Sequence, residues 1–322
     1  MGETLAGFTW QDCVDDVVGR LGTLTAVAER LSAENGFAED VGSIERALRR
    51  LRTRGQQAGG KWGARLLATF GLPGSVEARL RWMAAYHSRF TDLPVPVADD
   101  LLRLWEHPPT TERREARAFL ALARASLELR KNDHAAALRR LDPLIRELDR
   151  LPAEAAVELL LVRAFVASAT APAEVARWLG EVGPRLAQVT DSEERACLCA
   201  RLADQQAYEA NRRRDFAAAE AAYRALPTEG PPFVLCRRAN GLAYALHRQG
   251  RDEEAAALAR EAARHAGDGG HVRLRVMALS MLAHIDPREV AARDRAIAIS
   301  RRLEDETLLL RLERAALNPG RS

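Results

Sequence analysis

The chain has 322 residues, of which 47% are hydrophobic and only 5% aromatic, and its formal net charge is +3. It contains 60 alanines and 46 arginines but only two lysines. This composition favours helix and supplies few of the β-branched and aromatic residues that sheets need. We therefore expect an all-α protein. The arginine excess alone does not indicate nucleic-acid binding, because a GC-rich genome would produce the same bias.

The sequence also indicates where the protein works. Its longest apolar run, residues 157–162, contains Glu158 and is far shorter than the roughly 20 residues that span a bilayer. The first residues, MGETLAGFTWQDCVDD, are acidic and lack the pattern of a signal peptide. The four cysteines, Cys13, Cys197, Cys199 and Cys236, form no C-x-x-C and are too sparse for a disulfide framework. We expect a cytoplasmic protein that does not contact the membrane and whose thiols are buried.

Residues 1–92 are predicted to form a small helical domain. Its centre is predicted to contain a helix over 24–31, the linker AENGFAED and a second helix over 41–52. On the second helix, apolar Ile44, Leu48 and Leu51 share one side, and arginines occupy the other. Seven basic residues and one acid, Glu45, lie between residues 41 and 65 and give a local charge of +6. The basic residues are Arg46, Arg49, Arg50, Arg52, Arg54, Lys61 and Arg65.

The segment LTAVAERLS followed by SIERALRRLRTRG resembles the two central helices of a helix-turn-helix domain, and WGARLLATFGLP resembles the next helix of a repressor-like example. The resemblance implies that the second helix enters the major groove of DNA. The DNA contacts would then be Arg46, Arg49, Arg50, Arg54 and Lys61. The alternative is a solvated charged face, since the linker exceeds the usual three to four residues and residues 1–40 carry a net charge of −6. Arginines exposed on a compact helical domain would favour DNA binding.

A linker with a short helix is predicted over residues 93–110. The helix reads DDLLRLW and ends before His107-Pro108-Pro109, because consecutive prolines cannot continue a helix. Just upstream, RLRWMAAYHSRFTDL at 79–93 gathers four aromatic side chains, Trp82, Tyr86, His87 and Phe90. If these residues lie on a helix, their spacing predicts that they pack at the contact between two domains and do not form a ligand site.

From residue 111 onward, amphipathic helices alternate with short polar turns. In ANGLAYALHRQGRDEEAAALAREAARHA at 239–266, small apolar residues line one face of each of two helices, and a similar pattern lies 36 residues upstream. This resembles the tetratricopeptide repeat, a 34-residue helix pair. Turns are predicted at residues 132–133, 170–171, 214–215, 250 and 286–287. The resemblance implies a superhelix of about five antiparallel helix pairs over residues 111–322, closed by a helix over 303–317.

Polar residues recur with the same 36-residue spacing. Arg201, Tyr208 and Arg212 return as Arg237, Tyr244 and Arg248, and the next copy keeps Arg273. The resemblance places such positions in the ligand groove, where Arg, Asn and Tyr side chains suit peptide carbonyls and carboxylates. The predicted groove consists of Arg201, Asp204, Tyr208, Asn211, Arg212, Arg237, Asn240, Tyr244, His247, Arg248 and Arg273. The alternative is that these side chains only solvate one helix face.

No catalytic or metal-binding motif occurs in the sequence. It has no H-E-x-x-H, no P-loop, no G-x-G-x-x-G after a strand and no G-x-S-x-G. His265 and His271 flank the turn GDGG without a thiolate or carboxylate partner, and Cys197 and Cys199 point to different helix faces. We therefore expect no enzymatic activity, no cofactor and no metal.

The primary functional prediction is a protein- or peptide-binding adaptor or sensor. The alternative is a transcriptional regulator in which the N-terminal helices bind DNA and the repeats bind a peptide that changes a homodimer. That domain order resembles bacterial peptide-responsive regulators. The two predictions share the groove and differ in residues 41–65.

Overall fold

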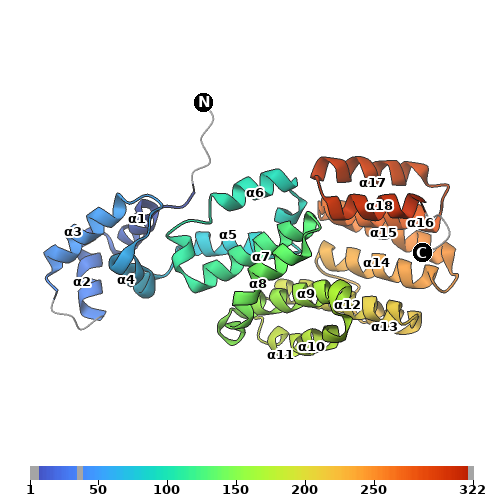
Figure 1. Ribbon diagram of the computed structural model, residues 1–322, viewed down its shortest axis with the longest axis horizontal. Helices are drawn as coiled ribbons and strands as arrows, with labels where there is room; N and C mark the ends of the chain where they lie inside the picture. Colours follow the sequence, from blue (N-terminus) through green and yellow to red (C-terminus); the bar gives the residue numbers. More distant parts are fainter. Residues whose placement is uncertain (1–6, 35–38, 318–322) are drawn as a thin grey trace. The chain divides into compact units, whose positions relative to one another are not determined.

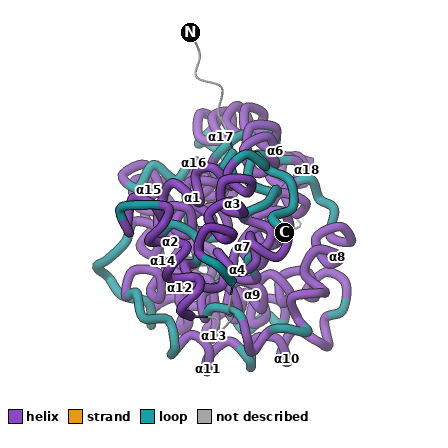
Figure 2. Tube along the Cα trace, turned by 90° about the vertical axis from the view of Figure 1, so that its left-hand side faces the viewer, coloured by secondary structure: helices purple, strands orange, loops and turns teal. Residues whose placement is uncertain are grey.

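The computed structural model describes residues 7–34 and 39–317. Helix accounts for 78% of the described residues, and these residues contain no strand, as Figure 2 shows. The prediction of an all-α protein is thus confirmed. Within the described ranges, every helix is too short or too polar to span a bilayer. The chain divides into two compact units, which are described separately: unit 1 (residues 1–84 and 99–123) and unit 2 (residues 85–98 and 124–322).

Unit 1 begins with helices that pack on one another. Helix α1 contacts α2 and α3, α2 packs on α3, and α4 contacts both α2 and α3 (Figure 1). Residues 35–38, within the predicted linker AENGFAED, lie outside the described residues. The first five helices are α1 (Trp10–Leu21), α2 (Leu24–Glu34), α3 (Val41–Arg52), α4 (Gly60–Phe70) and α5 (Gly74–Ala84).

The core of these helices centres on Trp10, whose side chain is fully buried. Its indole Nε1 donates a hydrogen bond of 2.8 Å to the carbonyl oxygen of Gln57, which satisfies the one polar atom of the ring. The backbone of α4 approaches the ring so closely that a Cβ atom on Gly59 or Gly63 would lie 2.2 or 2.6 Å from it. Glycine at both positions therefore permits this contact.

The remaining elements of unit 1 lie in residues 99–123. They are the second part of α6 (Val95–Arg103), η2 (Thr110–Glu112) and the first part of α7 (Arg114–Arg130), since the division between the units falls within both α-helices. The short helix predicted over DDLLRLW is present but begins earlier, at Val95, and ends at Arg103. In η2, Glu112 accepts a 2.7 Å hydrogen bond from the backbone N–H of Gly59.

The segment RLRWMAAYHSRFTDL does not form one helix, so its four aromatic side chains are not spaced along a helix as predicted from the sequence. Helix α5 ends at Ala84, and residues 85–94 contain only the short 3-10 helix η1 (Arg89–Asp92). Tyr86, His87 and Phe90 therefore lie in an irregular segment of unit 2.

Unit 2 is built from two layers of helices. Helices α9, α12, α14 and α16 are consecutive neighbours in the first layer, and α13, α15 and α17 pack against them in the second. Neighbouring helix pairs of this kind are compatible with a helical solenoid. The elements are α8 (His134–Ile145), η3 (Leu148–Arg150), α9 (Ala153–Thr170), η4 (Pro172–Glu174), α10 (Val175–Gly180), α11 (Val182–Leu186), α12 (Ser192–Arg212), α13 (Phe216–Arg224), α14 (Pro232–His247), α15 (Asp252–Asp268), α16 (Val272–Ile285), α17 (Val290–Leu303) and α18 (Glu306–Leu317).

The turns between these helices fall where the sequence predicts them. Asn132, Arg214 and Gly250 have positive φ angles of 59°, 60° and 78°, and they separate α7 from α8, α12 from α13 and α14 from α15. Asp133 and Asp215 follow the first two turns and accept hydrogen bonds from the backbone of α8 and α13 as N-caps. The predicted closing helix is shorter than expected, because α17 includes Leu303 and α18 begins at Glu306.

Small side chains allow the two layers to approach closely. Ala239 and Ala243 of α14 and Ala255 and Ala259 of α15 are at most 1% exposed. A Cβ atom added to Gly241 would lie 2.1 Å from the ring of Tyr223, so the α13–α14 contact requires glycine there. Close packing of small residues replaces the bulky aromatic core that this composition lacks.

The cysteines are free thiols, as expected, but not all are buried. Cys13, Cys197 and Cys236 are buried, whereas Cys199 is only partly so. Burial raises the pKa of each of the three buried thiols to about 12, so they remain protonated at neutral pH.

Candidate functional site

The residues predicted to form the groove lie on α12, α14 and α16, which are neighbours in the first layer of unit 2. We call the surface formed by these 36-residue repeat positions the ladder face. It has two parts with different environments. The buried half contains Arg201, Asp204, Arg237 and Arg273, and the open half contains Tyr208, Asn211, Arg212, Tyr244, His247 and Arg248. Asn240 lies between the two halves and is partly buried.

In the buried half, the three repeated arginines surround one side chain, that of Tyr86. The guanidinium carbons of Arg201, Arg237 and Arg273 lie 4.5, 5.4 and 5.6 Å from the centroid of the Tyr86 ring. Arg237 also donates a 3.1 Å hydrogen bond from Nη2 to the Tyr86 hydroxyl. The three predicted ligand-binding arginines therefore bind a side chain of their own chain.

Each of these arginines also has a carboxylate partner. Arg201 donates a hydrogen bond to Glu158 of α9. The Nη1 atom of Arg237 lies 2.9 Å from Oδ2 of Asp204, whose Oδ1 accepts a 3.1 Å hydrogen bond from the Tyr223 hydroxyl. Arg273 Nε lies 2.8 Å from Oδ2 of Asp305. Each buried guanidinium is thus paired with an opposite charge, as burial of a cation requires.

This cluster changes the acidity of its members. Burial raises the pKa of Tyr86, but the positive charges of Arg237, Arg273 and Arg201, together with the hydrogen bond from Arg237, outweigh it and lower the pKa to about 7. Burial raises the pKa of Asp204, and the attraction of Arg237 opposes that shift only in part. Burial, and then repulsion by Arg237, lower the pKa of Arg201 to about 10. A phenolate at Tyr86 is therefore stabilised close to neutral pH.

The residues around Tyr86 also contact the first-layer helices. The Tyr86 backbone N–H donates a 3.1 Å hydrogen bond to Glu158, and His87 Nε2 lies 2.9 Å from Oε2 of Glu194. Further along, Arg89 donates a 2.6 Å hydrogen bond to the carbonyl oxygen of Gly270.

Hydrogen bonds also fix the end of the segment that follows Tyr86, at residues 92–93. Asp92 accepts a 2.7 Å hydrogen bond from the backbone N–H of Arg273, and its other carboxylate oxygen lies 3.6 Å from His271 Nδ1. Arg130 of α7 donates a 2.7 Å hydrogen bond to the carbonyl oxygen of Leu93. Residues 85–93 therefore contact α9, α12, α14, α16 and Arg130 through polar groups.

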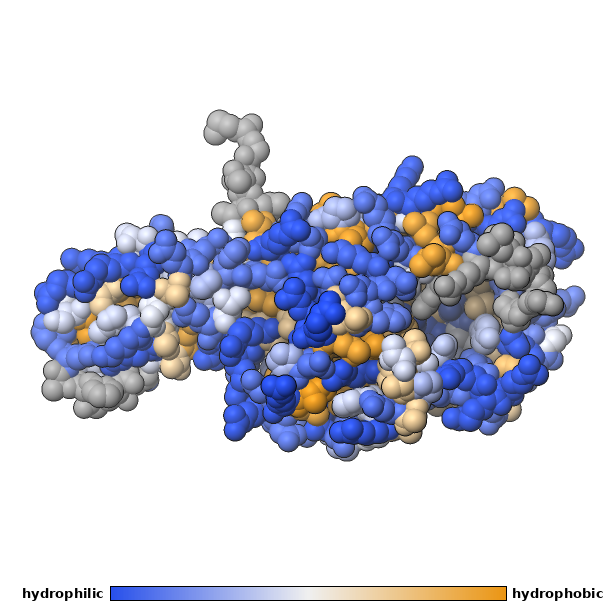
Figure 3. Space-filling view, in the orientation of Figure 1, coloured by the Kyte–Doolittle hydropathy of each residue, from blue (hydrophilic) through white to orange (hydrophobic). Residues whose placement is uncertain are grey.

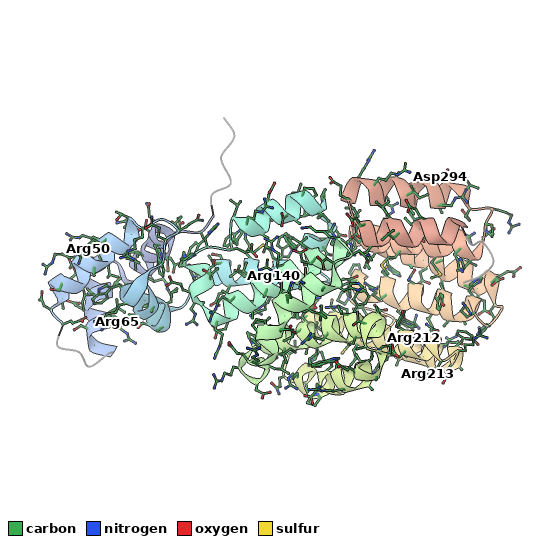
Figure 4. The ribbon with its side chains drawn as sticks, in the orientation of Figure 1. Arg50, Arg65, Arg140, Arg212, Arg213 and Asp294 are labelled. Atoms are coloured by element: carbon green, nitrogen blue, oxygen red, sulfur yellow. The ribbon has the colours of Figure 1, made fainter. Side chains whose placement is uncertain are left out.

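The open half of the ladder face carries side chains that solvent reaches. Tyr208 is 50% exposed. The guanidinium of Arg248 lies 5.1 Å from the Phe216 ring centroid and 5.9 Å from that of Tyr244, and no described carboxylate pairs with it. Its counterpart Arg212, at the end of α12 in Figure 4, donates hydrogen bonds to the Ser168 carbonyl oxygen and to Glu209.

The next repeat step places a histidine beside Arg248. His284 lies on α16, 36 residues after Arg248, and its ring centroid is 5.0 Å from that of His247. Burial, and then the nearby His247 and Arg248, lower the pKa of His284, so it is neutral at pH 7. His247 Nδ1 lies 2.7 Å from Asp252. Among the described side chains, the Oδ1 atoms of Asn211 and Asn240 are buried without a hydrogen-bond partner.

The histidines at the GDGG turn are not brought together as metal ligands. His265 lies 3.3 Å from Glu261, and His271 contacts Asp92 instead. The described residues contain no group of three His, Cys, Asp or Glu side chains placed to hold a metal ion.

In unit 1, the basic helix predicted to contact DNA is α3. Its apolar side, Ile44, Ala47, Leu48 and Leu51, is buried, and Arg46, Arg49 and Arg50 are exposed on the other side. Figure 4 labels Arg50 on α3, and Figure 3 shows that hydrophilic side chains cover much of this region. Of the other predicted contacts, Arg54 donates to the Ala58 carbonyl oxygen, and Lys61 pairs with Glu39 at 2.7 Å.

Tyr86 and Glu158, the partners of the ladder arginines, are not among the residues predicted from the sequence. Glu158 carried a usable signal, because a carboxylate inside the apolar run 157–162 needs a buried cation nearby. The sequence gives no comparable signal for Tyr86, apart from its position among other aromatic residues. No family model, curated protein or solved structure matches the chain.

Proposed function

We propose that the protein is a non-enzymatic protein- or peptide-binding adaptor or sensor, and that unit 2 holds a tetratricopeptide-like groove whose open half takes the partner peptide. The observation that supports this most is the environment of Arg248. Its guanidinium lies near two aromatic rings, those of Phe216 and Tyr244, without a described carboxylate partner. Such a group is fixed in orientation and keeps N–H donors for a carboxylate or carbonyl oxygen.

Neighbouring groups complement this donor. The amide groups of Asn211 and Asn240 lie on the same face, and their Oδ1 atoms are buried without a described hydrogen-bond partner, which costs about 1–3 kcal/mol for each such acceptor. Tyr208 and Tyr244 add apolar area with a polar tip, which is the character of residues that dominate binding surfaces. An extended peptide with an acidic group near Arg248 fits this set.

The test is a binding screen with an array of random 12-residue peptides, probed with the full chain. Peptides that bind should lose at least about tenfold in affinity when Tyr244 and Arg248 are both replaced by alanine, since each removed contact contributes on the order of 1 kcal/mol or more. Arg213→Ala is the matched control, because Arg213 is an exposed arginine outside the open half (Figure 4). Equal affinities of the double variant and the native chain would contradict the proposal.

A second function, transcriptional regulation through DNA binding by α3, is favoured by one observation. Arg46, Arg49 and Arg50 project from the outer side of a helix whose inner side is packed in a compact helical body. That is the arrangement in which a second helix reaches the major groove and its arginines neutralise phosphates. A peptide in unit 2 would then control a homodimeric regulator.

DNA binding is tested by fluorescence anisotropy with a mixed-sequence duplex at ~50 mM salt. If three arginines contact phosphates, the logarithm of affinity falls with a slope of about −2.7, so raising salt fourfold weakens binding by about 40-fold. The triple alanine variant of Arg46, Arg49 and Arg50 should abolish this salt-dependent binding. Alanine at Arg139, Arg140 and Arg213, three exposed arginines of unit 2, serves as the control for charge alone. Native protein that shows no binding at low salt would exclude this function.

A further inference from the structure

We propose that residues 85–93 are an intramolecular ligand of the buried half of the ladder face, and that an external peptide with the same tyrosine and aspartate competes with this segment for the three arginines. The proposal rests on the proposed function in one respect, namely that a peptide partner uses the ladder face. Residues 85–93 occupy the buried half, and their contacts show the chemistry that a competitor needs.

The segment is bound as a short peptide with one 3-10 turn, η1, would be bound. It has no α-helix of its own, since α5 ends at Ala84 and α6 begins at Val95. Its side chains and backbone contact four consecutive first-layer helices, with Tyr86 against α12, α14 and α16 and with Glu158 of α9 bound to the Tyr86 N–H. Repeated arginines on neighbouring helices thus converge on one tyrosine.

The segment makes many polar contacts, although Tyr86 also packs against the apolar core of unit 2. An external ligand with the same polar groups can take the place of these polar contacts. The polar contacts of the segment are made by Tyr86, His87, Arg89 and Asp92. When the segment leaves the ladder face, each of these groups exchanges its protein partner for another polar partner. The net free energy of such a bond is about 1.5–3 kcal/mol when one partner is charged, because water or a new ligand replaces the lost partner. Among the apolar side chains, Phe90 is the main anchor, with 1% exposure.

Because residues 85–93 belong to the same chain as their site, an external peptide needs a high affinity or a high local concentration to displace them. A segment joined to its site by a short connection has an effective concentration on the order of mM. A free peptide at micromolar concentration therefore loses the competition in the native chain. Weakening the internal segment should make the buried half accessible to a peptide added in trans.

The experiment uses the labelled peptide AYHSRFTDLPV, residues 85–95, and full-length chains. The Tyr86→Ala chain should bind this peptide at least about tenfold more tightly than the native chain, because the tethered competitor is weakened. Adding Arg237→Ala to the Tyr86→Ala chain should remove the binding. A peptide with alanine in place of its tyrosine is the matched control and should bind poorly to every chain.

Two outcomes overturn the proposal. One is a folded Tyr86→Ala chain, with native helical circular dichroism, that binds the peptide no better than the native chain. If this variant does not fold, hydrogen exchange of the native chain decides: the amides of residues 86–93 should exchange at least about tenfold faster than those of α14, through local opening. Equal protection would show a permanent core segment and would overturn the proposal.

The two proposals fail separately. The peptide-array test uses the native chain and variants of Tyr244 and Arg248, which lie in the open half. The test in trans uses a defined peptide and depends on Tyr86 and Arg237 in the buried half. A protein that binds no array peptide but accepts residues 85–95 in trans would reject the proposed function and keep the internal ligand.

Discussion

Tyr86 is expected to ionise near neutral pH in the native protein. Three arginines stand within 5.6 Å of its ring, and Arg237 donates a hydrogen bond to its hydroxyl. Burial opposes ionisation, but these positive charges lower the pKa to about 7. With an ordinary pKa near 10, only about 0.1% of the phenol would be ionised at pH 7, compared with about half in this environment.

Absorbance of tyrosinate at 295 nm measures this directly. The chain has four tyrosines, so one of them should ionise in a separate step around pH 7 with about a quarter of the total amplitude. Tyr223 cannot produce this step, since burial and then the nearby Asp204 raise its pKa well above 10. Tyr86→Phe should remove the step and keep the ring between the arginines.

The same shift predicts a pH dependence of stability, and its sign follows from linkage. Because the folded pKa is below the unfolded one, the ionised phenol stabilises the folded state fully above pH 10, and that contribution is lost as pH falls from 10 to 7. The free energy of unfolding of the native chain, relative to Tyr86→Phe, should therefore rise from pH 7 to pH 10. The slope is at most about 1.4 kcal/mol per pH unit.

Two results would refute this reasoning. The first is a native titration that shows no separate tyrosine step around pH 7. The second is a neutral step that persists in Tyr86→Phe, because another group would then be responsible. Tyr208→Phe is the control, and it should leave the neutral step in place because the exposed Tyr208 ring lies outside the arginine cluster.

Three further predictions concern stability, measured by urea unfolding. Gly63→Ala should lose about 1–3 kcal/mol, because its Cβ would lie 2.6 Å from the Trp10 ring, whereas the control Gly19→Ala, with open space around it in α1, should gain about 0.5–1 kcal/mol. Gly241→Ala should lose about 1–3 kcal/mol, since its Cβ would lie 2.1 Å from the Tyr223 ring. Glu158→Gln leaves the Arg201 charge without its buried partner and should cost about 3–5 kcal/mol. Losses below about 0.5 kcal/mol at any of these sites would contradict the packing or pairing described for that site.

Local sequence patterns predicted the helices of unit 2 and their turns well. The apolar periodicity of residues 239–266 matches α14 and α15. Gly250 lies in the turn between them, where its φ of 78° suits a residue that tolerates positive φ. Helix α3 likewise matches its predicted bounds, since the apolar stripe and the Asp40 N-cap are both local signals. These features depend on residues within a few turns of one another.

The division of the chain and the occupant of the ladder arginines depend on distant residues. The sequence predicts a domain over 1–92, a linker over 93–110 and a repeat region over 111–322, but residues 85–98 pack within unit 2 and residues 99–123 within unit 1. No period or turn signal marks these exchanges. The pairing of Tyr86 with Arg237 spans 151 positions of the sequence, and periodicity carries no information at that range.

A repeated residue therefore has a predictable orientation but an unpredictable environment. Arg237 and Arg248 lie on the same helix, α14, and both recur from the preceding repeat, yet Arg237 is 8% exposed and pairs with Asp204, whereas Arg248 has no described carboxylate. The helix alone gives both side chains the same access to the ladder face. What separates them is residues 85–93, which contact the N-terminal part of α14 and not Arg248. Removing that segment's tyrosine should consequently change the solvent accessibility of Arg237 and leave that of Arg248 unchanged, a difference that arginine-directed chemical labelling of the Tyr86→Ala chain measures.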